Sequence, residues 1–166
     1  MTLWSEEFSG VDFEEVFATR RAAVGALLDV LEATVPLLGG PREALFDSDT
    51  LAFVDEGTAL LRQFERAGEV PDFDEERFFE AAFLESDSLS PNAGAALRLF
   101  FGQVTQFATD QMDWTGVGDG LDACYEIVLQ HEALGRIVTV DMERENPRCR
   151  RAVEVQKERL ARSRAS

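Results

Sequence analysis

The chain contains few of the residues that metal sites and nucleophilic enzymes commonly use. Its 166 residues include one histidine, His131, and two cysteines. A zinc metalloprotease motif needs a second histidine four positions after the first, and position 135 is a glycine. A di-iron bundle needs a Glu-x-x-His motif on each of two helices. The single histidine excludes both kinds of site, and we expect His131 to be a surface or helix-end residue.

The two cysteines, Cys124 and Cys149, lack the spacing of a metal or redox motif. We predict that both are buried or partly buried free thiols, as free cysteines commonly are. A nucleophilic pair of Cys124 and His131 is disfavoured, because seven positions on one helix separate two residues by about 10 Å. A dispersed Ser/His/Asp triad stays open. Since no motif supports catalysis, we predict that the protein is not an enzyme and holds no cofactor.

Long apolar runs and a basic N-terminus are also absent. No run approaches the ~18 apolar residues of a transmembrane helix. Residues 1–7 are acidic where a secretory signal peptide needs a basic segment. We therefore expect a cytoplasmic protein with no membrane partner.

Cations are scarce relative to acids. The chain has 32 Asp and Glu against 16 Lys and Arg, a net charge of −16, whereas a magnitude of about 2–8 is enough to keep a small domain soluble. Such a charge repels nucleic acid and attracts basic proteins. Residues 144–166 are the exception, with 8 bases and 3 acids. We expect this segment to pair with the acidic body or stay solvated, and we predict no nucleic-acid partner.

Apolar side chains at helical spacing are abundant. Apolar residues make up 45% of the chain, and most of the 13 Phe rings are expected in the core. The spacing predicts an all-α fold, a single-domain helical bundle over residues 1–166 with about six helices. These helices are expected at Val11–Leu38, Thr50–Ala67, Asp74–Glu85, Pro91–Trp114, Asp119–Leu134 and Pro147–Arg162.

Three segments are expected to connect these helices. Residues 41–46 suggest a short helical turn. The glycine cluster at residues 116–120 lacks the preceding strand and the lysine of a phosphate loop, so we interpret it as an interhelical turn. Residues 136–140 form the only β-like run, and we expect an extended connector or an irregular continuation of the helix.

Two acidic clusters are the candidate partner-binding sites. We expect them to attract a cationic protein and to accelerate its association. A carboxylate site for Mg²⁺ or Ca²⁺ is the alternative. Its candidates are Asp72, Asp74, Glu75 and Glu76, or Asp110 and Asp113. The EF-hand spacing is missing, and we predict no metal. The first-choice cluster is Asp72, Asp74, Glu75, Glu76 and Glu80, and the second is Asp47, Asp49, Asp55 and Glu56.

A family resemblance is confined to the C-terminal third. The segments 121–127, 135–138, 142–147 and 152–157 together resemble the C-terminal part of small helical bacterial immunity proteins of polymorphic or contact-dependent toxin systems. The matching residues have the character of packing and capping signals, so the resemblance assigns no site residues.

Charge and resemblance together predict a non-enzymatic immunity protein. It would bind a cationic toxin domain through its acidic helix surfaces and occlude the toxin's site. One alternative is a structural or self-assembling helical protein whose acidity serves only solubility. Another is a helical enzyme with a carboxylate metal site. The sequence leaves the oligomeric state open.

Overall fold

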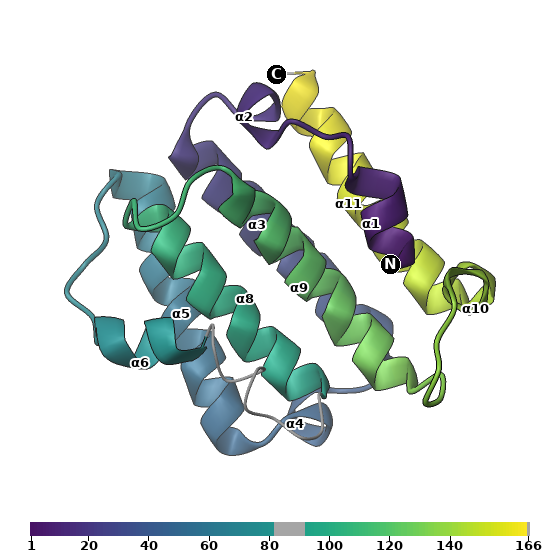
Figure 1. Ribbon diagram of the computed structural model, residues 1–166. Coiled ribbons are helices and arrows are strands. Elements are labelled where there is room, and N and C mark those ends of the chain that lie inside the picture. Colours follow the sequence, from purple (N-terminus) through teal and green to yellow (C-terminus); the bar gives the residue numbers. More distant parts are fainter. Residues whose placement is uncertain (82–91, 166) are drawn as a thin grey trace.

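Helices form all the regular structure that is described (Figure 1). The computed structural model describes residues 1–81 and 92–165. Within these ranges it has ten α-helices, one 3₁₀-helix and no strand, which confirms the all-α prediction and corrects the expected number of about six helices. The elements are α1 (Leu3–Phe8), α2 (Phe13–Val16), α3 (Arg20–Thr34), η1 (Val35–Leu38), α4 (Arg42–Leu45), α5 (Ser48–Ala67), α6 (Glu75–Ala81), α8 (Ala93–Ala108), α9 (Thr115–Glu132), α10 (Val140–Glu145) and α11 (Pro147–Arg164).

The antiparallel pair α8 and α9 lies at the centre of the fold (Figure 1). Helix α3 packs against both, α5 and α6 pack against α8, and α11 packs against α3 and α9. The rings of Phe100, Phe101, Phe107 and Tyr125 are fully buried in this core. Phenylalanine therefore supplies much of the apolar area that holds the helices together. None of the described helices combines the length and apolar character needed to cross a membrane.

The predicted helix from Val11 to Leu38 is wrong, because the chain breaks before α3. Asp12 caps the four-residue helix α2, and its side chain accepts a hydrogen bond from the Glu14 N–H at 3.1 Å. Thr19 then caps α3 by accepting from the Ala22 N–H at 3.1 Å. Each side-chain oxygen satisfies an N–H that has no partner within its helix. The run of apolar residues thus spans two helices and the 3₁₀-helix η1.

Two further predictions are corrected. The predicted helix from Pro91 to Trp114 extends too far at its C-terminal end, and the predicted glycine turn is part of a helix. Helix α8 ends at Ala108, and the chain reverses over residues 109–114, where Asp110 has a φ of +60°. The glycines at 116, 118 and 120 are buried inside α9. A Cβ at Gly120 would lie 3.0 Å from a methyl group of Leu27 and 3.1 Å from one of Val104. These glycines therefore serve close helix packing rather than a turn, and Pro91 lies outside the described residues.

Several predicted helix ends are confirmed. Asp47 caps α5 by accepting from the Thr50 N–H at 2.7 Å, and Gly68 ends that helix with a φ of +79°. Asn146 caps α11, which begins at Pro147. The short helix α4 falls within the predicted turn at 41–46, and residues 136–139 connect α9 to α10 without a helix or a strand. The predicted end of the third helix, at Glu85, lies outside the described residues.

Two short helices were not predicted, and a buried polar network joins them. Glu143 of α10 is 1% exposed, and its carboxylate accepts hydrogen bonds from the Leu3 N–H of α1 at 3.0 Å and from the Tyr125 O–H at 2.6 Å. The indole N–H of Trp4 donates to the side-chain oxygen of Gln156 at 2.7 Å. Through these bonds Tyr125, Glu143 and Gln156 hold α1 against α9, α10 and α11.

Both cysteines are buried free thiols, as predicted. Burial raises the pKa of Cys149 to about 11, and burial also raises the pKa of Cys124. A thiol attacks as its thiolate. At neutral pH both groups are therefore protonated and suited to packing rather than to nucleophilic chemistry.

Candidate acidic interaction site

The first predicted cluster lies on and just before α6, and we call it the α6 acidic face. It consists of five exposed carboxylates, Asp72, Asp74, Glu75, Glu76 and Glu80. The opposite side of the helix anchors it to the core, because Phe78 is fully buried and stacks on Phe53 of α5 with ring centroids 4.6 Å apart. The short amphipathic helix α6 thus packs one side on the core and exposes its carboxylates to solvent.

No cation of the described chain forms an ion pair with these five carboxylates, and residues 82–91 contain no Lys or Arg. Asp74 accepts the backbone N–H of Arg77 at 3.1 Å. The Arg77 guanidinium instead binds Glu56 of α5, with 2.5 Å between nitrogen and oxygen. Five negative charges on and just before α6 therefore have no cation partner among the described residues, and they favour the approach of a cationic surface.

The second predicted cluster is largely used within the protein. Asp55 forms an ion pair with Arg42 at 2.8 Å, and Glu56 is held by Arg77. Asp47 caps α5 and lies 4.0 Å from the guanidinium of Arg98. Asp49 is exposed and, among the described residues, has no side-chain partner. Of this cluster, Asp49 is therefore the member that is available to bind a partner together with the α6 acidic face.

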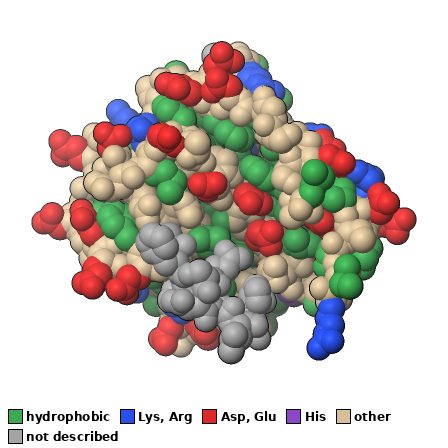
Figure 2. Space-filling view, viewed as in Figure 1, with side chains coloured by type: hydrophobic (Ala, Val, Ile, Leu, Met, Phe, Trp, Pro, Cys, Tyr) green, Lys and Arg blue, Asp and Glu red, His purple; other side chains and the backbone are tan. Residues whose placement is uncertain are grey.

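Aromatic side chains lie among the acids of α6. Phe73 and Phe79 are half-buried, and their rings meet edge to face with centroids 6.1 Å apart. Figure 2 shows acidic and hydrophobic side chains next to one another along the edge where α6 lies in Figure 1. Sequence reasoning missed these two rings as surface features. The signal was present in residues 72–80, where phenylalanine and acids alternate with only one base.

The basic C-terminal segment pairs with the acidic body, as predicted. Arg159 binds Asp29 of α3 at 3.0 Å, and Arg148 binds Glu132 of α9 at 3.0 Å. Arg144 and Lys157 bind Glu6 and Glu7 of α1. At Glu132, where burial alone would raise the pKa, the bonds from Arg148 and Asn146 hold it below its usual value.

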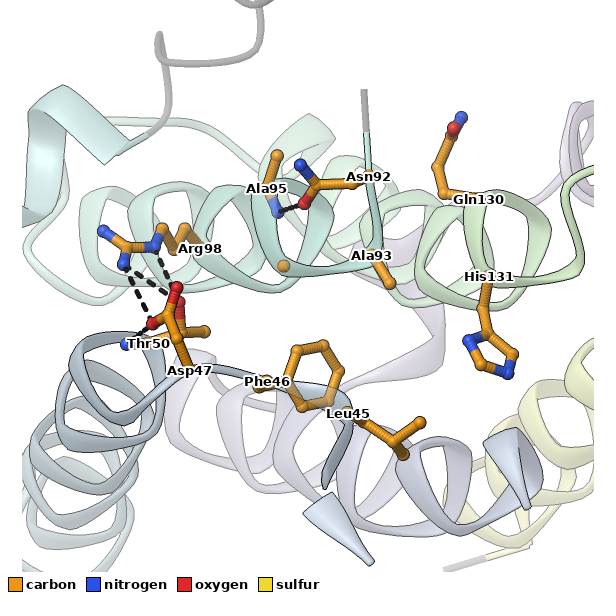
Figure 3. Close-up of a pocket in the computed structure, with 11 residues that line it drawn as sticks. Leu45, Phe46, Asp47, Thr50, Asn92, Ala93, Ala95, Arg98, Gln130 and His131 are labelled. Carbon is orange, nitrogen blue, oxygen red and sulfur yellow. Dashed lines mark hydrogen bonds and ion pairs between the residues drawn. The ribbon is translucent and has the colours of Figure 1, made fainter. Parts of the chain in front are cut away.

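A second feature is a cleft of about 590 Å³ between the ends of α5, α8 and α9 (Figure 3). At one end the guanidinium of Arg98 donates to the Thr50 hydroxyl at 2.9 Å, beside Asp47. Hydrogen bonding to the Thr50 N–H lowers the pKa of Asp47. His131, in the last turn of α9 as predicted, lies at the other end beyond the Phe46 ring. His131 therefore lies apart from Thr50 and Asp47 in the cleft.

Two of the residues considered for a metal site, Asp110 and Asp113, have other contacts. Asp110 forms an ion pair with Arg20 at 3.1 Å, and the Asp113 carboxylate accepts the Thr115 N–H at 3.0 Å. Within residues 1–81 and 92–165, no group of three or more His, Cys, Asp or Glu side chains has a geometry that could hold a metal ion.

Comparison with known proteins adds no assignment. No family model, no curated protein and no solved structure matches the chain. The functional argument therefore rests on the geometry and charge of the α6 acidic face.

Proposed function

We propose that this protein is a non-enzymatic inhibitor of the immunity type. It binds a cationic toxin domain through the α6 acidic face and occludes the toxin's functional site. The observation that carries the proposal is the set of five exposed carboxylates on and beside α6 that have no cation partner in the part of the chain that the structure describes. The C-terminal resemblance to immunity proteins supports the same class of function.

The composition of this face suits a protein partner better than a small ligand. Protein interfaces combine a buried apolar centre, often aromatic, with a polar rim. Phe73 and Phe79 supply apolar surface, and the surrounding carboxylates supply charge. Complementary charge raises association rates to about 10⁸–10⁹ M⁻¹s⁻¹ at low salt. An inhibitor that must intercept a toxin benefits from such a rate.

The test is a pull-down with the tagged protein from its native cells, washed at low and at high salt and analysed by mass spectrometry. We expect one basic protein to be enriched at low salt and weakened at high salt, because salt screens exposed charges. Its own sequence would identify the activity that is inhibited. The purified partner should then lose that activity when the protein is added.

A pair of matched variants tests the face itself. Glu75→Lys/Glu76→Lys reverses two charges in the first turn of α6, whereas Glu14→Lys/Glu15→Lys reverses two charges in the first turn of α2. The two variants change the net charge by the same amount, and both place the changes in the first turn of a short helix. We expect only the α6 variant to lose partner binding, by more than about tenfold, with melting temperatures measured for both. Equal binding by the two variants would reject the α6 acidic face as the docking surface.

A further inference from the structure

A cavity of about 400 Å³ lies at the surface between α5, α6 and α8. It is lined by Asp49, Ala52 and Phe53 of α5, by Arg77 and Glu80 of α6, and by Arg98 of α8. It therefore brings Glu80 of the α6 acidic face together with Asp49, the member of the second cluster that has no side-chain partner among the described residues. Its volume is within the range of about 300–1,000 Å³ in which proteins bind small groups.

The charges around this cavity are not balanced. Arg77 is held by Glu56 at 2.5 Å, and Arg98 lies 4.0 Å from Asp47. Both guanidinium groups therefore have carboxylate neighbours of their own. Asp49 and Glu80 have no such neighbour among the described residues, although both line the same space. The cavity retains two carboxylates that a cation from outside would neutralise.

The wall of the cavity already accommodates guanidinium groups. Arg77 lies over the Phe53 ring with its central carbon 5.3 Å from the ring centroid, and Arg98 lies at 5.9 Å. Attraction between a cation and the face of an aromatic ring stabilises such contacts. Ala52 is exposed and has only a methyl group, so the side chain at this position leaves the space open.

We propose that an arginine of the cationic partner inserts between α5 and α6 and binds Asp49 and Glu80. A guanidinium group presents several N–H donors in a planar fork, which suits two carboxylates better than a single ammonium group does. The proposal rests on the proposed function and adds an anchor to it. General attraction draws the partner to the α6 acidic face, and this cavity fixes one of its side chains.

The test uses a fluorescent nona-arginine peptide and fluorescence anisotropy at low ionic strength. Asp49→Asn/Glu80→Gln removes the two carboxylate charges that line the cavity, and Glu75→Gln/Glu76→Gln removes two charges elsewhere on α6. We expect the first pair to raise the Kd about tenfold and the second pair about threefold or less, since only the first removes direct contacts.

A steric variant separates insertion from charge. Ala52→Leu fills the cavity without a change of charge, and Ala59→Leu makes the same change at an exposed position two turns further along α5. We expect Ala52→Leu to raise the Kd about fivefold and Ala59→Leu to leave it unchanged, because only Ala52 lines the cavity. Thermal melts of both variants show whether they fold like the wild type.

The outcomes distinguish this inference from the proposed function. If both charge pairs weaken binding equally and the two leucine variants bind alike, arginine insertion is overturned while electrostatic docking stands. If the wild-type protein does not bind the peptide at low ionic strength, both are overturned. Selective loss in Asp49→Asn/Glu80→Gln and in Ala52→Leu establishes the cavity as the anchor.

Discussion

The phenolic O–H of Tyr125 donates a 2.6 Å hydrogen bond to the carboxylate of Glu143 in the interior of the protein. Glu143 also accepts the backbone N–H of Leu3 at 3.0 Å. A buried carboxylate is costly unless donors surround it. Tyr125 is thus one of two groups that allow an acid to reside between α1, α9 and α10.

Removal of this hydroxyl should therefore destabilise the protein. Tyr125→Phe leaves the carboxylate of Glu143 with one fewer donor, and we expect a loss of about 1–3 kcal/mol in the free energy of unfolding. Urea denaturation measures it. In Tyr125→Phe/Glu143→Leu the losses should be less than additive, because the buried charge is gone. Strict additivity would show that the hydrogen bond contributes nothing.

Gly57 is buried within α5 beside the Phe101 ring. A Cβ at this position would lie 2.5 Å from a ring carbon of Phe101, which is itself fully buried. Alanine normally favours a helix over glycine by about 1 kcal/mol, but we expect overpacking to prevail in Gly57→Ala, with a net loss of about 1–3 kcal/mol. Gly10→Ala is the control, because its Cβ would meet no atom within 4 Å. A melting temperature above that of the wild type would contradict the expected clash.

The cap of α5 predicts a pH dependence. The pKa of Asp47 is lowered in the folded state by the Thr50 N–H. A carboxylate with a lowered folded pKa stabilises the protein above its unfolded pKa of about 3.9, and this contribution is lost as the pH falls through the folded pKa. The stability difference between wild type and Asp47→Ala should therefore shrink below about pH 4. Asp47→Asn retains an uncharged capping oxygen, and its difference from Asp47→Ala should not vary with pH over that range.

Two neighbouring rings of α6 should separate folding from binding. Phe78 is fully buried, so Phe78→Ala should cost about 3–5 kcal/mol of stability. Phe79 is half-buried at the surface of α6. Phe79→Ala should cost clearly less in chemical denaturation, yet weaken binding of the partner identified by pull-down. A Phe79→Ala protein that binds with wild-type affinity would remove this ring from the interface.

The elements that the sequence predicted correctly depend on local signals. Asp47, Gly68 and Asn146 end or begin their helices through bonds to residues within one turn. Gly120 of α9 could not be interpreted locally, because it is needed for contact with Leu27 and Val104 of other helices. Helices α1 and α10 were not predicted for the same reason, because contacts between residues far apart in the chain hold them in place.

The candidate site also combines features that follow from local sequence with features that depend on long-range contacts. The exposure of the α6 carboxylates follows from a short amphipathic pattern, and it was predicted. The pairing of Asp55 with Arg42 and of Glu56 with Arg77 depends on how α4 and α6 pack against α5. Those arginines lie 13 and 21 positions from their partners. Helical spacing within α5 carries no information about either contact.

The contacts of α1 set an order for folding during synthesis. Leu3 binds Glu143, and Trp4 binds Gln156, which is 152 positions further along the chain. Contacts of such long sequence separation form late, because the intervening chain must first be ordered. Helix α1 thus has its binding surface completed only after α10 and most of α11 have been synthesised. Until residue 156 has been synthesised, the apolar residues Leu3 and Phe8 have no completed site in which to be buried.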